Sequence, residues 1–240
     1  LPLQVHELDA LYHRGDAVHD LDVGWPRCVS GLALGLGDAF DTLIEGPDAA
    51  WLTEQGFLVP ARIFAPPGID LSAVKRFDTA KGRHDSDTIL RQGQAMGDAV
   101  SHYHRTIKAH HNGTAIAFCC SIDHASHVAA SFNAAGISAA TLLGNTTDRD
   151  AVVAAFDAGS VQILVTVDVV SEGFDIPAAS CAILLRPTQS LGLYLQQVGR
   201  VLRPAPDKAA AIVLDHVGNV HRHGFPDDHR EWSLAEGARR

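Results

Sequence analysis

Cysteine pairs with C-x-x-C spacing, long apolar runs and a surplus of basic residues are all missing from this 240-residue chain. Its four cysteines contain no C-x-x-C pair, which argues against a disulfide framework or a cysteine zinc site and indicates a reducing compartment. No apolar run reaches the roughly 18 residues of a membrane span, and no basic-then-apolar signal segment opens the chain. We therefore expect a cytoplasmic protein without a membrane partner.

The formal net charge is −9, so the chain as a whole is not a basic nucleic-acid binder. This balance leaves room for a local basic groove. The composition is 46% hydrophobic and 20% charged, which is ordinary for a globular protein able to bury a full core. The length suits one large domain, or one domain with appendages.

Residues 1–39 mix His, Asp, Gly and Pro without a clean hydrophobic period. The stretch from Gly31 to Gly37 is glycine-rich, but it lacks the Lys and Ser or Thr of a Walker A loop. We interpret residues 1–39 as poorly ordered or atypical, residues 40–232 as one domain, and residues 233–240 as a tail. Because the first residue is Leu1 rather than Met, we expect a fragment, a processed product or a shifted reading frame.

Strand and helix patterns alternate along the rest of the chain. Strands with few polar residues are typical of parallel sheets covered on both faces, so we predict a doubly wound α/β fold with ligands at the carboxyl ends of the strands. The expected strands cover 62–65, 114–120, 137–143, 161–167, 181–185 and 209–214, and the expected helices cover 48–55, 87–111, 121–135, 147–158 and 190–202.

Histidines gather near the end of the longest expected helix, at His102, His104, His110 and His111. Imidazoles near a helix C-terminus are favoured by the helix dipole, and few of these pairs have metal-ligand spacing on a helix. We interpret them as a solvated face and expect no metal site.

Two later stretches contain residues suited to chemistry. Thr166 to Pro177 follows a buried strand and contains Glu172, Gly173 and Asp175, where a glycine admits a ligand and carboxylates accept from sugar hydroxyls. An ordinary polar loop is the alternative. In the second stretch, Arg200 and Arg203 lie three residues apart and share one helical face, which suits a clamp for phosphate oxygens. A basic helix end favoured by its own dipole is the alternative there.

In this order and spacing, the two stretches resemble motifs of the C-terminal RecA-like domain of superfamily-two DEAD/DEAH-type helicases. The nearest branch is that of phage helicases and restriction-enzyme motor subunits, and the resemblance runs from about Phe40 to Trp232. It implies a RecA-like parallel sheet flanked by helices, and an ATP-driven motor acting on DNA or RNA.

The resemblance implies a nucleotide-facing set of residues. Glu172, Gly173 and Asp175 match the fifth helicase motif, which meets the γ-phosphate side and the ribose of ATP when two motor domains close. The sixth motif matches a second set, in which Arg203 is the arginine finger and Arg200 its companion: Gln196, Gly199, Arg200 and Arg203.

It also implies contacts with a nucleic-acid backbone. Ser121 matches the fourth motif, although it is equally a good helix N-cap. Gly144 and Thr146 match a loop of the family whose backbone touches phosphates. Thr166 matches a threonine that contacts nucleic acid, but its hydroxyl stands one position early, which puts that contact in doubt. Asp215-His216 with Gly218-Asn219 resembles a signature that follows the sixth motif, and we interpret His216 as structural.

The motifs of the first motor domain do not occur in this sequence. Neither a Walker A loop nor an Asp-Glu box occurs, so the chain has no cradle for ATP phosphates and Mg²⁺. We therefore expect ATP with Mg²⁺ to bind only together with a Walker-A-bearing RecA-like domain, in cis or in trans, and the chain alone to be inactive. The alternatives are a non-catalytic nucleic-acid-binding or regulatory module, or a decayed helicase fragment.

Overall fold

The computed structural model describes residues 45–65, 94–107, 113–167, 179–188 and 190–231, with side chains described from Ala99 onward in the second of these segments. Residues 47–229 form one compact unit; the rest of the chain is grouped separately. None of the described helices is long and apolar enough to cross a membrane.

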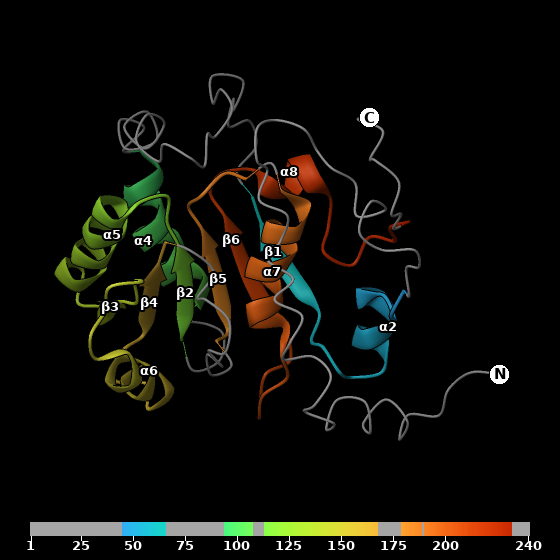
Figure 1. Ribbon diagram of the computed structural model, residues 1–240, viewed down its shortest axis with the longest axis horizontal. Coiled ribbons are helices and arrows are strands. Elements are labelled where there is room, and N and C mark those ends of the chain that lie inside the picture. The colour runs from blue at the N-terminus through green and yellow to red at the C-terminus, as the bar shows by residue number, and fades with distance from the viewer. Residues whose placement is uncertain (1–44, 66–93, 108–112, 168–178, 189, 232–240) are drawn as a thin grey trace. The chain divides into compact units, whose positions relative to one another are not determined.

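A parallel sheet of six strands forms the centre of the described region (Figure 1), in the order β1-β6-β5-β2-β4-β3. Every neighbouring pair is parallel, which confirms the predicted RecA-like α/β fold class. The strands are β1 (Ala61–Phe64), β2 (Ala115–Phe118), β3 (Ala139–Thr141), β4 (Ile163–Thr166), β5 (Cys181–Leu184) and β6 (Ala211–Asp215).

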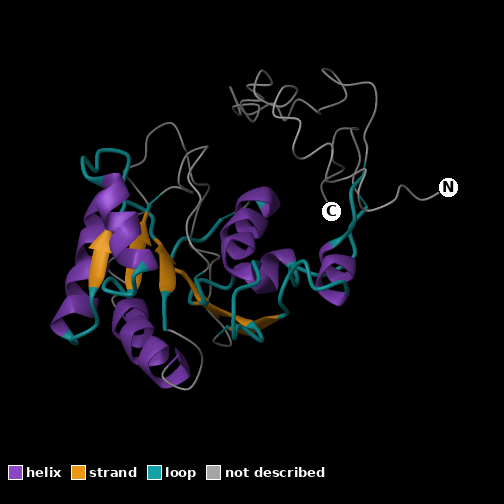
Figure 2. Cartoon of the chain, turned by 90° about the horizontal axis from the view of Figure 1, so that it is seen from below, coloured by secondary structure: helices purple, strands orange, loops and turns teal. Residues whose placement is uncertain are grey.

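Helices cover both faces of this sheet (Figure 2), because each apolar strand sends alternate side chains to opposite sides. In β2, Ile116 and Phe118 join one core with α6 and α7, whereas Ala115 and Ala117 join the other with α4 and α5. The helices are α2 (Ala49–Glu54), α4 (Gln94–Ile107), α5 (Ile122–Ala134), α6 (Arg149–Asp157), α7 (Leu191–Leu202) and α8 (Asn219–His223).

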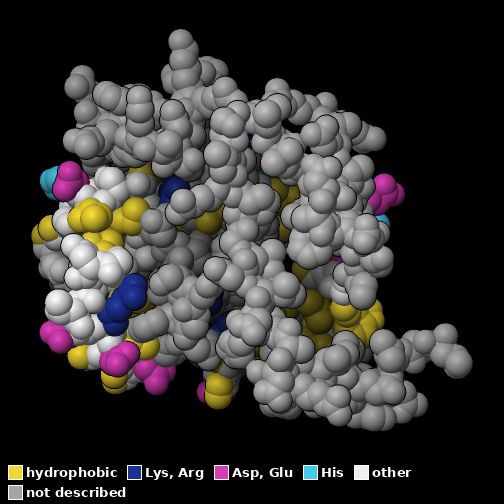
Figure 3. Space-filling view, viewed as in Figure 1, with side chains coloured by type: hydrophobic (Ala, Val, Ile, Leu, Met, Phe, Trp, Pro, Cys, Tyr) yellow, Lys and Arg dark blue, Asp and Glu magenta, His cyan; other side chains and the backbone are white. Residues whose placement is uncertain are grey.

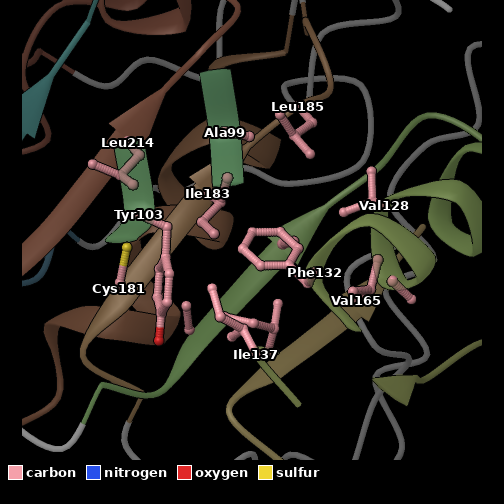
Figure 4. Close-up of a cluster of buried hydrophobic side chains, with 14 of the residues drawn as sticks. Ala99, Tyr103, Val128, Phe132, Ile137, Val165, Cys181, Ile183, Leu185 and Leu214 are labelled. Carbon is pink, nitrogen blue, oxygen red and sulfur yellow. The ribbon is translucent and has the colours of Figure 1, made fainter. Parts of the chain in front are cut away.

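Aromatic packing anchors the second core. Figure 4 shows Phe132 of α5 among the side chains of β4, β5 and α4. Its ring meets that of Tyr103 edge to face, with centroids 5.6 Å apart. The Tyr103 hydroxyl donates to the carbonyl of Gly113, so one side chain ties α4 to the start of β2.

Most predicted boundaries are confirmed by local chemistry. Asp48 caps α2 through a 2.8 Å bond from the amide of Trp51, and Ser121 caps α5. Gly136, at φ +77°, ends α5 in the left-handed conformation that glycine adopts without strain. The short helix α8 was not predicted, because it contains one turn of polar residues after Gly218.

Candidate nucleotide and nucleic-acid sites

The four predicted sixth-motif residues lie on α7 and at its end. Gln196, Gly199 and Arg200 share one helical face by their spacing. Arg203 follows as the C-cap of α7 with an extended backbone, at φ −62° and ψ 135°. Gln196 and Arg203 are exposed, and Arg200 is half-buried. The opposite face is buried in the core with Tyr194, Val198, Val201 and Leu202. The predicted spacing of Gln196, Gly199 and Arg200 on one face of α7 is therefore confirmed, and the roles of these residues stay predictions.

Glycine at position 199 has no folding explanation within the described structure. A Cβ built there meets no heavy atom within 4 Å, and no positive φ is recorded. Glycine inside a helix is less stable than alanine by roughly 0.5–1 kcal/mol. The position therefore suits a close approach by something outside the described residues.

The arginine end of α7 lies at the amino-terminal edge of the sheet. The amide of Val59, just before β1, donates to the carbonyl of Leu202 at 2.9 Å. The ammonium of Lys208 bonds both Arg203 and Ala179, which stands just before β5. A helix of twelve residues is about 18 Å long, and α7 starts after the carboxyl end of β5 and runs back. Arg203 therefore lies away from the carboxyl ends of the strands, where we expected the ligand sites.

The predicted fifth-motif residues Glu172, Gly173 and Asp175 lie outside the described residues. The described chain enters that segment at Val167, after β4, and leaves it at Ala179, before β5. Their roles stay predictions.

Ser121 stands at the carboxyl end of β2, where it caps α5. Its Oγ accepts from the amide of His124 at 3.2 Å. The ring of His124 turns back, and its Nδ1 accepts from the amide of Cys120 at 3.3 Å. Burial, followed by the nearby His127, lowers the pKa of His124, which keeps Nδ1 unprotonated and able to accept. The hydroxyl of Ser121 still has its own proton to donate.

Gly144 and Thr146 belong to a compact turn after β3. The Thr146 hydroxyl accepts from the amide of Leu143 at 2.9 Å, and the Thr146 amide donates to the carbonyl of Leu143 at 3.1 Å. Gly144 is exposed at the tip, and a Cβ there would meet nothing within 4 Å. The turn therefore holds its shape by itself and leaves room for a ligand at the glycine.

The beginning of α6 is acidic. Asp148 occupies the N-cap position without a side-chain cap bond, and Asp150 stands in the first turn. Carboxylates already complement the positive end of the helix dipole. These carboxylates disfavour a second anion at this helix N-terminus, so the turn at Gly144 is the better position for a phosphate contact.

Thr166 is the last residue of β4 and is only 2% exposed. It pairs with Phe118 in the central part of the sheet, and its carbonyl accepts from the amide of Cys119 at 2.7 Å. The contact of Thr166 with nucleic acid, already in doubt from its position in the sequence, is disfavoured by this burial, because an enclosed side chain is hard for a bound strand to reach.

A buried polar network joins the ends of β5 and β6. Asp215 accepts from the amides of Val217 at 3.2 Å and Val220 at 2.7 Å. Asn219 accepts from the amide of Thr188 and donates to the carbonyl of Arg186, both at 3.0 Å. The signature noted in the sequence is therefore a brace between two loops.

Two further residues at these strand ends make contacts that link neighbouring loops and helices. His216 is buried, and its ring meets that of His102 edge to face with centroids 5.3 Å apart, in keeping with a structural role. Arg186, which sequence reasoning did not single out, donates from Nη1 to the carbonyl of Val167 at 3.0 Å. It thereby links the loop after β5 to the end of β4.

Charges of both signs share the described surface. Figure 3 shows one face, on which the described Lys and Arg side chains form small groups near Asp and Glu side chains. Within the described residues, no three His, Cys, Asp or Glu side chains are grouped so that they could hold a metal ion.

Comparisons with known proteins agree with this fold. Residues 98–205 match the family described as the helicase conserved C-terminal domain. A 51.5 kDa protein of a Lactococcus phage is 36% identical over 201 residues, which cover 82% of this chain and 43% of that protein. A Schizosaccharomyces pombe protein described as the mitochondrial ATP-dependent helicase irc3 is 33% identical over 116 residues, covering 48% of this chain and 19% of its own length.

A solved structure shows the same fold. A fragment described as the HsdR subunit of a type I restriction enzyme from Vibrio vulnificus YJ016 superposes with a TM-score of 0.61 at 20% identity, covering 78% of this chain and 38% of that one. The chain spans less than half the length of the curated relatives that it matches. The family match over residues 98–205 and the parallel sheet together identify this part of the chain as a helicase conserved C-terminal domain with a RecA-like fold.

Proposed function

We propose that this chain is the C-terminal motor half of an ATP-dependent DNA or RNA helicase. In this proposal Arg203 is the arginine finger, Arg200 lies beside it on the triphosphate, and Gln196 completes the set. The observation that carries the proposal is the end of α7, where Gly199, with open space at its Cβ position among the described residues, is followed by Arg200 and by the exposed C-cap residue Arg203.

The positive charge of this face suits the phosphates of a nucleotide. Two guanidiniums offer several N–H donors to phosphate oxygens, and the open glycine allows a second surface to come near. ATP supplies the phosphoryl group that is transferred, and the arginines would stabilise the charge that develops on it. Glu172, Gly173 and Asp175 would meet the ribose and the γ-phosphate side. Mg²⁺ would be held by a Walker-A-bearing domain, because the sequence contains no Asp-Glu box.

Nucleic acid would bind at the carboxyl edge of the sheet, away from the arginines. Ser121 and the turn with Gly144 and Thr146 offer hydroxyl and backbone N–H donors there. Donors of this kind contact the phosphate backbone rather than base edges, so we expect little sequence preference and a strong dependence on salt.

The decisive experiment uses the complete protein, in which a Walker-A-bearing domain accompanies this chain. We expect Arg203→Ala to lower nucleic-acid-stimulated ATP turnover by about 10³-fold or more. Arg105→Ala is the matched control, because Arg105 is also an exposed arginine near a helix C-terminus, on α4. Turnover of Arg203→Ala close to the wild-type rate would contradict the finger assignment. ATP-independent binding that survives in this variant would then favour a non-catalytic module.

A further inference from the structure

Lys208 is a buried cation whose three donors are all engaged. Its side chain is in the loop between α7 and β6, where the residue is 6% exposed. The ammonium donates to the carbonyls of Ala179 at 2.8 Å, Val201 at 2.7 Å and Arg203 at 2.8 Å. An ammonium has three N–H donors, so this arrangement uses all of them.

The loop that contains Lys208 turns back onto the helix that it has just left. The amide of Lys208 donates to the carbonyl of Ala205 at 3.1 Å, and Asp207 takes a positive φ of 61°. At the end of α7, the ammonium of Lys208 donates to the carbonyls of Val201 and Arg203, and the amide of Val59 donates to the carbonyl of Leu202. The end of α7 is thus closed by contacts from distant parts of the chain.

A buried lysine is a costly way to end a helix. Helices α5 and α6 end at Gly136 and Gly159, each with a positive φ, and need no buried charge. What Lys208 adds is the third bond, to Ala179. Ala179 stands just before β5, so this bond ties the end of α7 to the start of a strand in the sheet.

We propose that Lys208 is a positioning residue that fixes the backbone of Arg203 relative to Ala179 and the sheet, so that the side chain of Arg203 is held toward the nucleotide. The inference rests on the proposed function. One ammonium bonds the end of α7 and the residue just before β5 at the same point. A shift in either is therefore passed to the other.

The first test measures steady-state ATP hydrolysis by the complete protein with Lys208→Met. This change keeps most of the side-chain length and removes all three donors. We expect kcat to fall by about 10- to 100-fold, the size of effect that a misplacement of about 1 Å produces, with a smaller change in KM. Val128→Ala, which truncates a buried side chain of α5 on the other face of the sheet, controls for lost stability. Its kcat should stay near the wild-type value.

The second test is a double-mutant cycle with Arg203→Ala. If Lys208 acts through Arg203, Lys208→Met should lower kcat in the wild-type background and add little in the Arg203→Ala background. A wild-type kcat for Lys208→Met, or losses that multiply fully, would overturn the inference while Arg203→Ala alone remains impaired. Normal turnover in Arg203→Ala would instead overturn the proposed function and the inference with it.

A third variant keeps the tests decisive if Lys208→Met does not fold. Lys208→Arg retains the charge but moves the donors into a planar fork. We expect a folded protein with a reduced kcat, and a kcat equal to the wild type in this folded variant would count against positioning.

Discussion

Helices α5 and α7 begin in the same way. Each follows a buried strand, and each is capped by a serine whose Oγ accepts an amide at 3.2 Å, Ser121 from His124 and Ser190 from Leu193. Each then buries one face, α5 against β3 and β4 and α7 against β5 and β6. Up to this point, the needs of folding explain both helices.

The two helices differ on their outer faces and at their ends. On the outer face of α5, the exposed Ser126 and the half-buried Ser131 donate their hydroxyls to carbonyls of their own helix, and the helix ends at Gly136. The outer face and the C-cap of α7 carry two arginines after an open glycine, and the end of this helix is closed by a buried ammonium. The comparison distinguishes the features that the stability of a helix requires from those that it does not require. The second group, here the arginines, the open glycine and the buried ammonium of α7, contains the candidates for function.

The largest expected difference is in the free energy of unfolding that a substitution removes, between the inner face of α5 and the outer face of α7. Phe132 is fully buried and packs against Tyr103, so Phe132→Ala should lower the free energy of unfolding by about 3–5 kcal/mol. Gln196 is exposed, and Gln196→Ala should change it by less than about 0.5 kcal/mol. Urea unfolding of both variants measures the contrast, and similar losses would show that the outer face of α7 also supports the fold.

The second prediction concerns the ends of the helices and their response to pH. Burial lowers the pKa of Lys208 from 10.5 to about 8. Between these values the unfolded chain holds the proton more tightly, so the free energy of unfolding rises with pH. We expect the wild type to gain about 1–3 kcal/mol relative to Lys208→Met over this range, since the three carbonyls oppose part of the shift.

Unfolding curves of both proteins from pH 7.5 to about 10.5 isolate this residue, because other lysines and tyrosines titrate alike in the pair. The gain should be absent below the folded pKa, where Lys208 is protonated in both states. A difference that stays flat, or that falls as the pH rises, would contradict the direction of the shift.

The third prediction uses the two caps as matched partners. Ser121→Ala and Ser190→Ala should each lower the free energy of unfolding by about 1 kcal/mol, because each removes one equivalent cap bond. Only Ser121→Ala should also weaken binding of a labelled single strand, followed by fluorescence anisotropy at several salt concentrations. Equal loss of binding in both variants would assign the effect to stability alone and would leave Ser121 as a cap.

The sequence predicted the parts that short-range rules determine. The apolar strands, the serine caps, the glycine stops and the shared face of Gln196, Gly199 and Arg200 all depend on residues within a few positions of one another. The bond of Lys208 to Ala179 could not be predicted from the sequence, because the two residues are 29 positions apart and no local pattern marks them as partners. The burial of Thr166 likewise depends on how neighbouring strands pack.

The placement of the arginines at the amino edge of the sheet has a similar origin. Helical spacing determines the face on which Arg200 lies, but only the direction of the return crossover determines the edge that Arg200 and Arg203 reach. The brace between Asp215, Asn219 and Thr188 is also a long-range feature, with 31 residues separating Thr188 from Asn219. Local patterns therefore predict the faces of elements better than their positions in the fold.

A substitution on α7 that should stabilise the fold and lower turnover sharpens the comparison most. Because a Cβ at position 199 meets nothing within 4 Å, Gly199→Ala should raise the free energy of unfolding by about 0.5–1 kcal/mol. In the complete protein the same methyl group would stand where a nucleotide or a second domain approaches, so ATP turnover should fall. Ser126→Ala, on the exposed face of α5, should stabilise slightly and leave turnover unchanged. If Gly199→Ala gains stability and keeps full turnover, nothing comes close to that face, and the glycine has no part in the site.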